Sequence, residues 1–467
     1  MDTLANIYQK EQELLRQYSK PDLLAKRNFS SQDLLSQIGI DIDFGHLPQG
    51  YLNLYPQDFI VEEVSSEGRV LDILPTNLNC PPPPNDTVPT LYAELVKAGL
   101  STIEAVTEIA RALGVPLEKI NYAGLKDKVA ITAQQISVND ANYEKVSQLD
   151  LKGMFLKNFY WGTGNIYKGK LRGNQFTIII RTPVTLGQGW LKSLLAQYKD
   201  GFYNFYYVQR FGSDRAFGHL VGRLILQRKF KEAVEMYMTD CGFQDVPVLN
   251  KIRSEAKKYF GDFKKLQEIF SQLPYTLKIE NEMAQYLAEN KDDYLGALKL
   301  HIEHLTLWVY SYGSYLFNLH LSYLIKENKA IPKRLPLLLN PKYAKVSTYL
   351  KQLQADGITD LENVVKEIFS KEMFRPQNTA PSKVPVKVIK AQIHQKSVVL
   401  NFRLPLGAYA TTFLSHLFLL YRGMPIPDWV DQTKYDSKEI LGLGSLKDAK
   451  NILGEEMFSQ ILEAVNN

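Results

Sequence analysis

The stretch NYAGLKDKVAITAQ, residues 121–134, holds a single carboxylate, Asp127, between two lysines. Gly124 predicts a tight turn, from which Asp127 projects on a short loop between strands. A carboxylate that nearby cations keep ionised can act as a nucleophile or a base. Residue types alone favour a solvated turn aspartate paired with Lys126 or Lys128, and they leave the catalytic interpretation open beside it.

A second candidate is the aromatic-rich stretch GFYNFYYVQRFG, residues 201–212, which carries Asn204, Gln209 and Arg210. Aromatic rings stack on nucleobases, while amide and guanidinium groups bind base edges and phosphates. The same composition is typical of a buried strand with one arginine at its edge. Both interpretations stand at this point.

A third candidate is the basic loop IYKGKLRGN, residues 166–174, in which Lys168, Lys170 and Arg172 surround two glycines. Glycines let the backbone approach a phosphate closely, and lysine and arginine neutralise its charge. The whole chain is only mildly basic, with 55 basic and 50 acidic residues and a net charge of +5. Overall charge alone therefore does not indicate a nucleic-acid partner.

Other common sites are missing from the sequence. Its two cysteines, Cys80 and Cys241, and its seven histidines show no metal-ligand spacing, and no phosphate-binding glycine motif or GxSxG occurs. No apolar run is long enough to span a membrane, and the N-terminus is charged. We expect a cytoplasmic protein without a metal or a membrane segment.

Along the chain, hydrophobic periodicity predicts strands, then a long helical block, then strands again. Ser101 and Glu104 form a capping box that predicts a helix start, and Gly114 with Pro116 ends that helix. A polyproline loop is expected at 80–86 and a helix at 409–421. Strands are predicted at 50–64, 91–99 (half-buried), 131–138, 174–181, 201–212, 384–393 and 397–405.

This order favours an α+β fold interrupted by a helical insertion. The predicted units are an N-terminal helical extension at 1–45, a catalytic core at 46–219 and 376–430, an insertion domain at 220–375, and a C-terminal helical tail at 431–467.

The motifs taken together are more specific than any one of them. The segment YAGLKDKVAITAQ resembles the AGxKDxxAxTxQ signature of the TruD family of tRNA pseudouridine synthases, and NFYYVQRFG resembles that family's NYFGxQRFG segment. PQDFIVEE, KLRGNQF, SYLFN and LPLGAYAT are similar to four further family segments. The six occur in the family's order, over about residues 50–415.

The resemblance implies a pseudouridine synthase catalytic core carrying a largely helical TruD-type insertion. It implies isomerisation of a uridine in RNA, typically uridine 13 of tRNA, without a cofactor or a metal. Asp127 would be the catalytic carboxylate, and Tyr206 the aromatic platform under the detached uracil. Asn204, Lys126 and Phe59 are further expected substrate contacts, and Lys168, Lys170, Arg172 and Arg210 are expected contacts to the RNA backbone.

The sequence departs from the family at Asn53, where a lysine that pairs with the catalytic aspartate is usual. An amide cannot supply the positive charge that lowers a carboxylate pKa. Lys126, Lys128 or another cation takes over that role, or activity is reduced. The change at Asn53 leaves one alternative, an RNA-binding protein without activity on the same fold. A further alternative is an unrelated enzyme with an aspartate nucleophile, such as a hydrolase of a small substrate, but it predicts a metal or phosphate site and the sequence shows none.

Overall fold

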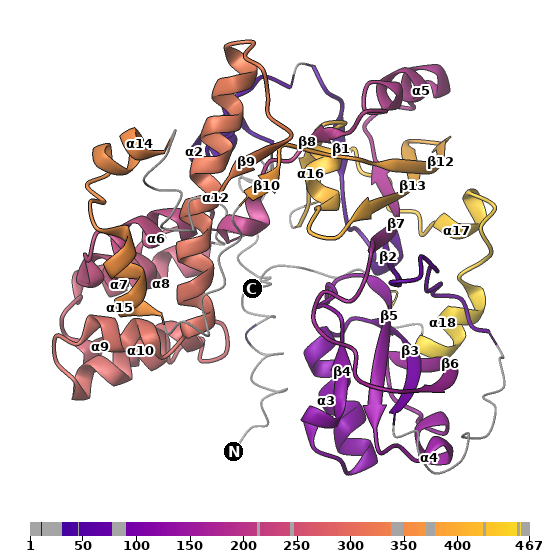
Figure 1. Cartoon of the computed structure of the whole chain (residues 1–467), viewed down its shortest axis with the longest axis horizontal. Helices are drawn as coiled ribbons and strands as arrows, with labels where there is room; N and C mark the ends of the chain where they lie inside the picture. The colour runs from indigo at the N-terminus through magenta and orange to yellow at the C-terminus, as the bar shows by residue number, and fades with distance from the viewer. Residues whose placement is uncertain are drawn as a thin grey trace.

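The computed structural model describes most of the chain. The described residues are 11, 30–44, 46–76, 90–212, 215–242, 247–337, 349–369, 379–423, 426–454 and 458. The polyproline segment, Cys80 and most of the N-terminal extension, up to residue 29 apart from residue 11, lie outside them. Figure 1 shows a lobe built on a large sheet beside a lobe built of helices.

A ten-stranded sheet has the order β12-β13-β7-β2-β5-β3-β6, with β1, β14 and β4 attached beside that path. Neighbours along the path are antiparallel except β2 and β5, which run parallel. The strands are β1 Gln49–Tyr51, β2 Phe59–Val64, β3 Thr90–Ala98, β4 Ile120–Tyr122, β5 Ile131–Asn139, β6 Met154–Gly162, β7 Gly173–Arg181, β12 Lys387–His394, β13 Ser397–Pro405 and β14 Leu419–Tyr421.

Strand β3 is buried at every residue, so the expectation of a half-buried strand is wrong. Helix α3 (Thr102–Leu113) shares a hydrophobic cluster with Ala93 and Leu95. Val96 and Ala98 lie in another cluster, together with residues of the C-terminal helix α18 (Lys447–Leu453). Because both faces are covered, even the polar side chains of β3 are enclosed.

Helix α3 begins as the sequence predicts. Ser101 Oγ accepts from the backbone N–H of Glu104, and the Glu104 carboxylate accepts from the N–H of Ser101, at 3.2 and 2.7 Å. Gly114 ends the helix with a φ of +67°, a left-handed conformation that glycine adopts without a steric penalty. This capping fixes the start of α3 next to the loop that carries Asp127.

The predicted strand at 201–212 is mostly absent. Only β8 (Phe202–Tyr203) forms, pairing with β11 (Lys383–Val384), and a 3₁₀ turn follows at Val208–Phe211. Between them the backbone bonds to other partners, including the side chain of Asn318. The predicted helix at 409–421 is also shorter, since α16 (Ala410–Ser415) gives way to β14, which pairs with β1.

The expected helical block is confirmed, with one addition. A two-stranded ribbon of β9 (Arg334–Pro336) and β10 (Thr379–Pro381) brackets its last part. The helices are α6 Gly218–Leu226, α7 Phe230–Thr239, α8 Pro247–Lys258, α9 Phe263–Phe270, α10 Lys278–Glu289, α11 Tyr294–Lys299, α12 Ile302–Lys326, α14 Leu350–Ala355 and α15 Leu361–Ile368.

The long helix α12 joins the two lobes (Figure 1). Its first half contributes Trp308 and Tyr312 to the core of the helical lobe. Its second half contributes Phe317 and Leu321 to the core that lies against the sheet. One continuous helix therefore sets how the aromatic segment near 206 meets the helical lobe.

Candidate active site

Asp127 lies in the loop between β4 and β5 and is exposed to solvent. Among the residues that the structure describes, none donates a hydrogen bond to its carboxylate or forms an ion pair with it. The predicted position on a short loop between strands is confirmed. The Asp127 carboxylate is therefore accessible to a substrate.

Buried polar side chains hold the backbone of this loop. The Thr102 hydroxyl accepts from the N–H of Lys126 and donates to Gln134 Oε1, each at 2.8 Å. Gln134 Nε2 in turn donates to the carbonyl of Gly124 at 3.2 Å. Since Thr102 and Gln134 are fully buried, the loop stands on a rigid base that fixes where the Asp127 side chain starts.

A third support comes from Lys97 on β3, whose side chain is completely buried. Its Nζ donates to the carbonyl oxygens of Leu100 and Asp127 at 2.6 and 3.0 Å. Burial lowers the pKa of the Lys97 ammonium to about 7, and the negative charge of Asp127 partly opposes that shift. A titratable cation therefore lies directly behind the candidate catalytic residue.

The two lysines that flank Asp127 have other carboxylate partners. Lys126 Nζ lies 2.8 Å from Glu63 Oε2, and both side chains are buried. Lys128 Nζ lies 2.8 Å from Glu104 Oε1 on α3. The pairing of Asp127 with either lysine, expected for an idle turn residue, is wrong. A contact of Lys126 with substrate would have to share its ammonium group with Glu63.

Tyr206 packs against the core that lies on the sheet. Its ring lies edge-on to Phe317 with 5.3 Å between centroids, and the Arg210 guanidinium lies 5.5 Å from its centroid. Burial raises the pKa of Tyr206 to about 12, so its phenol is neutral at working pH. Asn318, which the sequence offered only as part of the SYLFN match, bonds to both backbone groups of Tyr206.

Arg210 is fixed by its own neighbours on α12. Its Nε donates to Ser314 Oγ at 3.0 Å, and its guanidinium lies 5.6 Å from the centroid of Tyr310. Gln209, which precedes it, accepts from the Thr411 hydroxyl at 3.1 Å. These contacts direct one cation and one amide from the 3₁₀ turn toward the space between the lobes.

A cavity of about 870 Å³ opens between the lobes. From the sheet side it is lined by Lys128, Gln209, Arg210 and Tyr409, and from the helical side by residues that include Lys278 and Trp308. Lys128 brings the loop of Asp127 to the same cavity as the Arg210 turn. The structure thus unites two segments that are about 80 residues apart in the sequence.

The basic loop at 166–174 adjoins the start of the Asp127 loop. The N–H of Gly169 donates to the carbonyl of Ala123 at 2.7 Å, and Gly169 has a φ of +91° with open space where a Cβ would point. Lys168 is exposed, and Lys170 lies 5.7 Å from the ring centroid of Tyr167. Arg172 already donates through Nε to the carbonyl of Ser66 at 2.6 Å.

Two expected substrate contacts occupy structural positions. Phe59 is 6% exposed and packs edge-on against Phe176, with centroids 6.2 Å apart. Asn204 is 7% exposed, and its Nδ2 donates to the carbonyl of Pro381 at 3.0 Å. Their contact with substrate stays a prediction.

Asn53 lies beside the Asp127 loop, as its place in the motif predicts. Its Nδ2 lies 3.4 Å from the carbonyl of Val129. Its φ of +59° is in the left-handed region, which asparagine adopts more readily than lysine. The backbone at this position therefore suits the residue found there, although it brings no charge.

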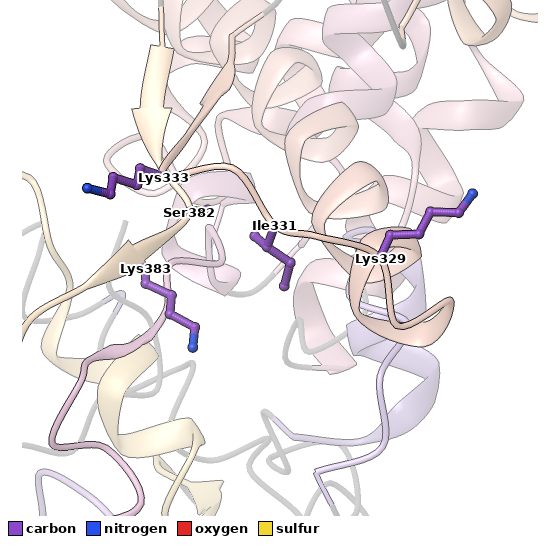
Figure 2. A pocket seen from close by; sticks show the side chains of 5 residues that line it. All are labelled: Lys329, Ile331, Lys333, Ser382 and Lys383. Carbon is purple, nitrogen blue, oxygen red and sulfur yellow. The ribbon is translucent and has the colours of Figure 1, made fainter.

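A second hollow, of about 570 Å³, is lined by Lys329, Ile331, Lys333, Ser382 and Lys383. Figure 2 shows that the ammonium groups of its three lysines point apart rather than toward one centre. Lys383 lies over the ring of Tyr203 at 4.9 Å. This surface is basic but offers no convergent site for a single anion.

Within the described ranges there is no group of three or more histidine, cysteine or acidic side chains that would hold a metal ion. Nor do these ranges contain a helix long and apolar enough to cross a membrane.

A model of the family described as tRNA pseudouridine synthase D (TruD) matches residues 47–336. The chain belongs to the TruD family. TruD proteins are isomerases that act on tRNA, and the mixed sheet with a helical insertion confirms the expected fold class. The residue boundaries given for the domains stay predictions.

The similarity extends over most of the chain. A relative from Methanocaldococcus jannaschii, named probable tRNA pseudouridine synthase D 1, is 28% identical over 380 residues, which are 78% of this chain and 94% of the relative. The tRNA pseudouridine synthase D of Aquifex aeolicus is 27% identical over 370 residues, 70% of this chain and 91% of the relative. A crystal structure assigned to TruD of Methanosarcina mazei has a TM-score of 0.58 at 25% identity, covering 83% and 98% of the two chains.

Proposed function

We propose that the protein converts uridine 13 of tRNA to pseudouridine, with Asp127 as the catalytic carboxylate and without a cofactor. The observation that supports a catalytic role for Asp127 is its exposed carboxylate on a loop held by buried polar side chains. Its side chain is exposed and unpaired among the described residues, while buried Thr102, Gln134 and Lys97 fix its loop. A surface turn aspartate needs no such support, whereas a catalytic group does.

The reaction is an isomerisation, so the product contains the same atoms as the substrate and no co-reactant is consumed. The target uridine must leave the base stack, at a cost of a few kcal/mol. Attack by the Asp127 carboxylate, at the ribose or at the base, leads to cleavage of the N1–C1′ bond. The uracil turns and C5 bonds to C1′, and the bond from Asp127 to the substrate breaks, which returns its electron pair to the carboxylate. The C5 proton is lost and N1 gains a proton.

The surrounding residues supply binding rather than further covalent steps. Tyr206 presents a neutral aromatic ring on which a uracil can stack, and base–aromatic stacking contributes about 1–3 kcal/mol. Arg210 and Lys128 line the cavity and attract phosphates. The basic loop around Gly169 extends the positive surface next to the Asp127 loop.

The position of modification tests this proposal. We would incubate the protein with a tRNA transcript, derivatise pseudouridine with a carbodiimide, and map reverse-transcription stops. We expect one stop, at position 13, and none in a transcript with cytidine there. A stop at another uridine would overturn the assignment of uridine 13 as the target. No stop in any tRNA would overturn the proposed pseudouridine synthase activity.

The alternative of an RNA-binding protein without activity rests on Asn53. It predicts tRNA binding with no product. Because the same transcripts serve both measurements, binding without a stop would select this alternative directly.

A further inference from the structure

We propose that Lys97 is a positioning residue of the reaction, supplying through the backbone of the Asp127 loop the positive charge that Asn53 does not provide. This rests on the proposed function, because it assigns a role relative to the catalytic carboxylate. Lys97 lies on the opposite side of the loop from solvent and does not contact substrate. It acts through Asp127 rather than on the uridine.

The contacts of Lys97 require an ammonium group. Its Nζ donates to the carbonyls of Leu100 and Asp127 and lies 3.5 Å from that of Lys126. An ammonium carries three donors and can serve three carbonyls, whereas a neutral amine has two. None of these acceptors is a carboxylate, so the charge of Lys97 is not cancelled by an ion pair within the described residues.

The other cations near the loop do have carboxylate partners. Glu63 pairs with Lys126, and Glu104 pairs with Lys128, each at 2.8 Å. The charged groups that act on Lys97 are Asp127 and Glu104, which favour its charge, and Lys126 and Lys128, which oppose it; the effect of Asp127 is the largest of the four. Lys97 and Asp127 are therefore electrostatically coupled, although their side chains do not touch.

Through this coupling, the positive charge of Lys97 affects the catalytic function of Asp127. A positive charge behind the loop stabilises the negative charge that returns to Asp127 when its bond to the substrate breaks. Burial lowers the pKa of Lys97 to about 7, so the cation is partly lost just above neutral pH. The catalytic rate should then fall as the ammonium loses its proton.

The test uses Lys97→Met, which keeps the length of the side chain without its charge, and Lys97→Arg, which keeps a charge that does not titrate. The matched control is Lys157→Met. Lys157 is also a buried lysine of the same sheet, with burial lowering its pKa, but it donates to the carbonyl of Leu74 and pairs with Glu94 away from the loop. Thermal stability, kcat and KM would be measured for each variant.

We expect Lys97→Met to lower kcat by roughly 10²-fold, the order found when one electrostatic donor is removed, with KM for tRNA little changed. Lys157→Met, at a similar loss of stability, should keep kcat. Wild type should lose activity above about pH 7, while Lys97→Arg should stay active to higher pH.

Equal kcat values for the two methionine variants would overturn the inference. If Lys97→Met does not fold, the arginine variant decides alone: an alkaline limb at the same pH as in wild type would overturn it. An inactive wild type would instead contradict the proposed function.

Discussion

The side-chain amide of Asn318 spans the backbone of Tyr206, accepting from its N–H at 2.9 Å and donating to its carbonyl at 2.8 Å. Asn318 is fully buried on α12, and its Nδ2 also donates to the carbonyl of Ile38. The proposed aromatic platform is therefore positioned by the helix that joins the two lobes.

Replacing Asn318 by alanine should free the Tyr206 backbone. We expect a loss of about 1–3 kcal/mol in unfolding free energy, because buried backbone groups lose their partners. We also expect a fall of about tenfold in kcat. Ser322→Ala is the control, since Ser322 lies one turn later on α12 and bonds to Gly39 instead. A normal kcat for Asn318→Ala would show that the platform needs no such clamp.

The hydroxyl of Tyr206 should be dispensable. No described residue bonds to it, and the ring alone provides the stacking surface. Tyr206→Phe should therefore keep kcat/KM within about twofold, while Tyr206→Ala should lose about 1–3 kcal/mol of stacking. Steady-state kinetics on one tRNA would separate the two variants. A large defect in the phenylalanine variant would mean that the hydroxyl takes part.

The buried ion pair of Lys126 and Glu63 should contribute more to the free energy of unfolding than the more exposed pair of Lys128 and Glu104. Glu63→Gln leaves a buried ammonium without its carboxylate, and we expect a loss of about 3–5 kcal/mol in urea unfolding. Lys128→Met removes the more exposed pair with Glu104 and should cost under about 1 kcal/mol. Similar losses for both would contradict the burial argument.

The lowered pKa of Lys97 also predicts that stability and activity change in opposite directions with pH. Its pKa is lowered in the folded state, so the penalty of burying its charge is fully present below about pH 7. Above that pH the unfolded chain binds the extra proton, and the contribution of this group to stability rises up to the ordinary lysine pKa. Unfolding at pH 6.5 and 8.5 should show this rise in wild type, and Lys97→Met should lack it.

The basic loop should bind RNA through charge. Lys168→Gln should reduce the salt dependence of tRNA affinity by about one unit of slope, since one phosphate contact is lost. Lys192→Gln, an exposed lysine on α5 (Gln188–Ala196), should leave the slope unchanged. Equal slopes for wild type and Lys168→Gln would show that Lys168 does not contact an RNA phosphate.

Local signals in the sequence predicted local structure well. The capping box of Ser101 and Glu104, and the turn that presents Asp127, depend on neighbouring residues and were readable from them. The burial of Lys97 was not, because it depends on α3 and the Asp127 loop, both later in the chain, covering the face of β3 that carries Lys97. The aromatic stretch failed as a strand for a related reason: Asn318, 112 residues later, takes the backbone bonds that a neighbouring strand would have used.

The most direct measurement is tritium release from tRNA carrying 5-tritiated uridine, under single turnover, with wild type and Asp127→Asn. Each pseudouridine formed frees the label at C5, and the substitution preserves shape while removing the carboxylate. We predict release by wild type and none by Asp127→Asn, with tRNA binding equal in both. Release by Asp127→Asn at the wild-type rate would contradict the assignment of Asp127 as the catalytic residue.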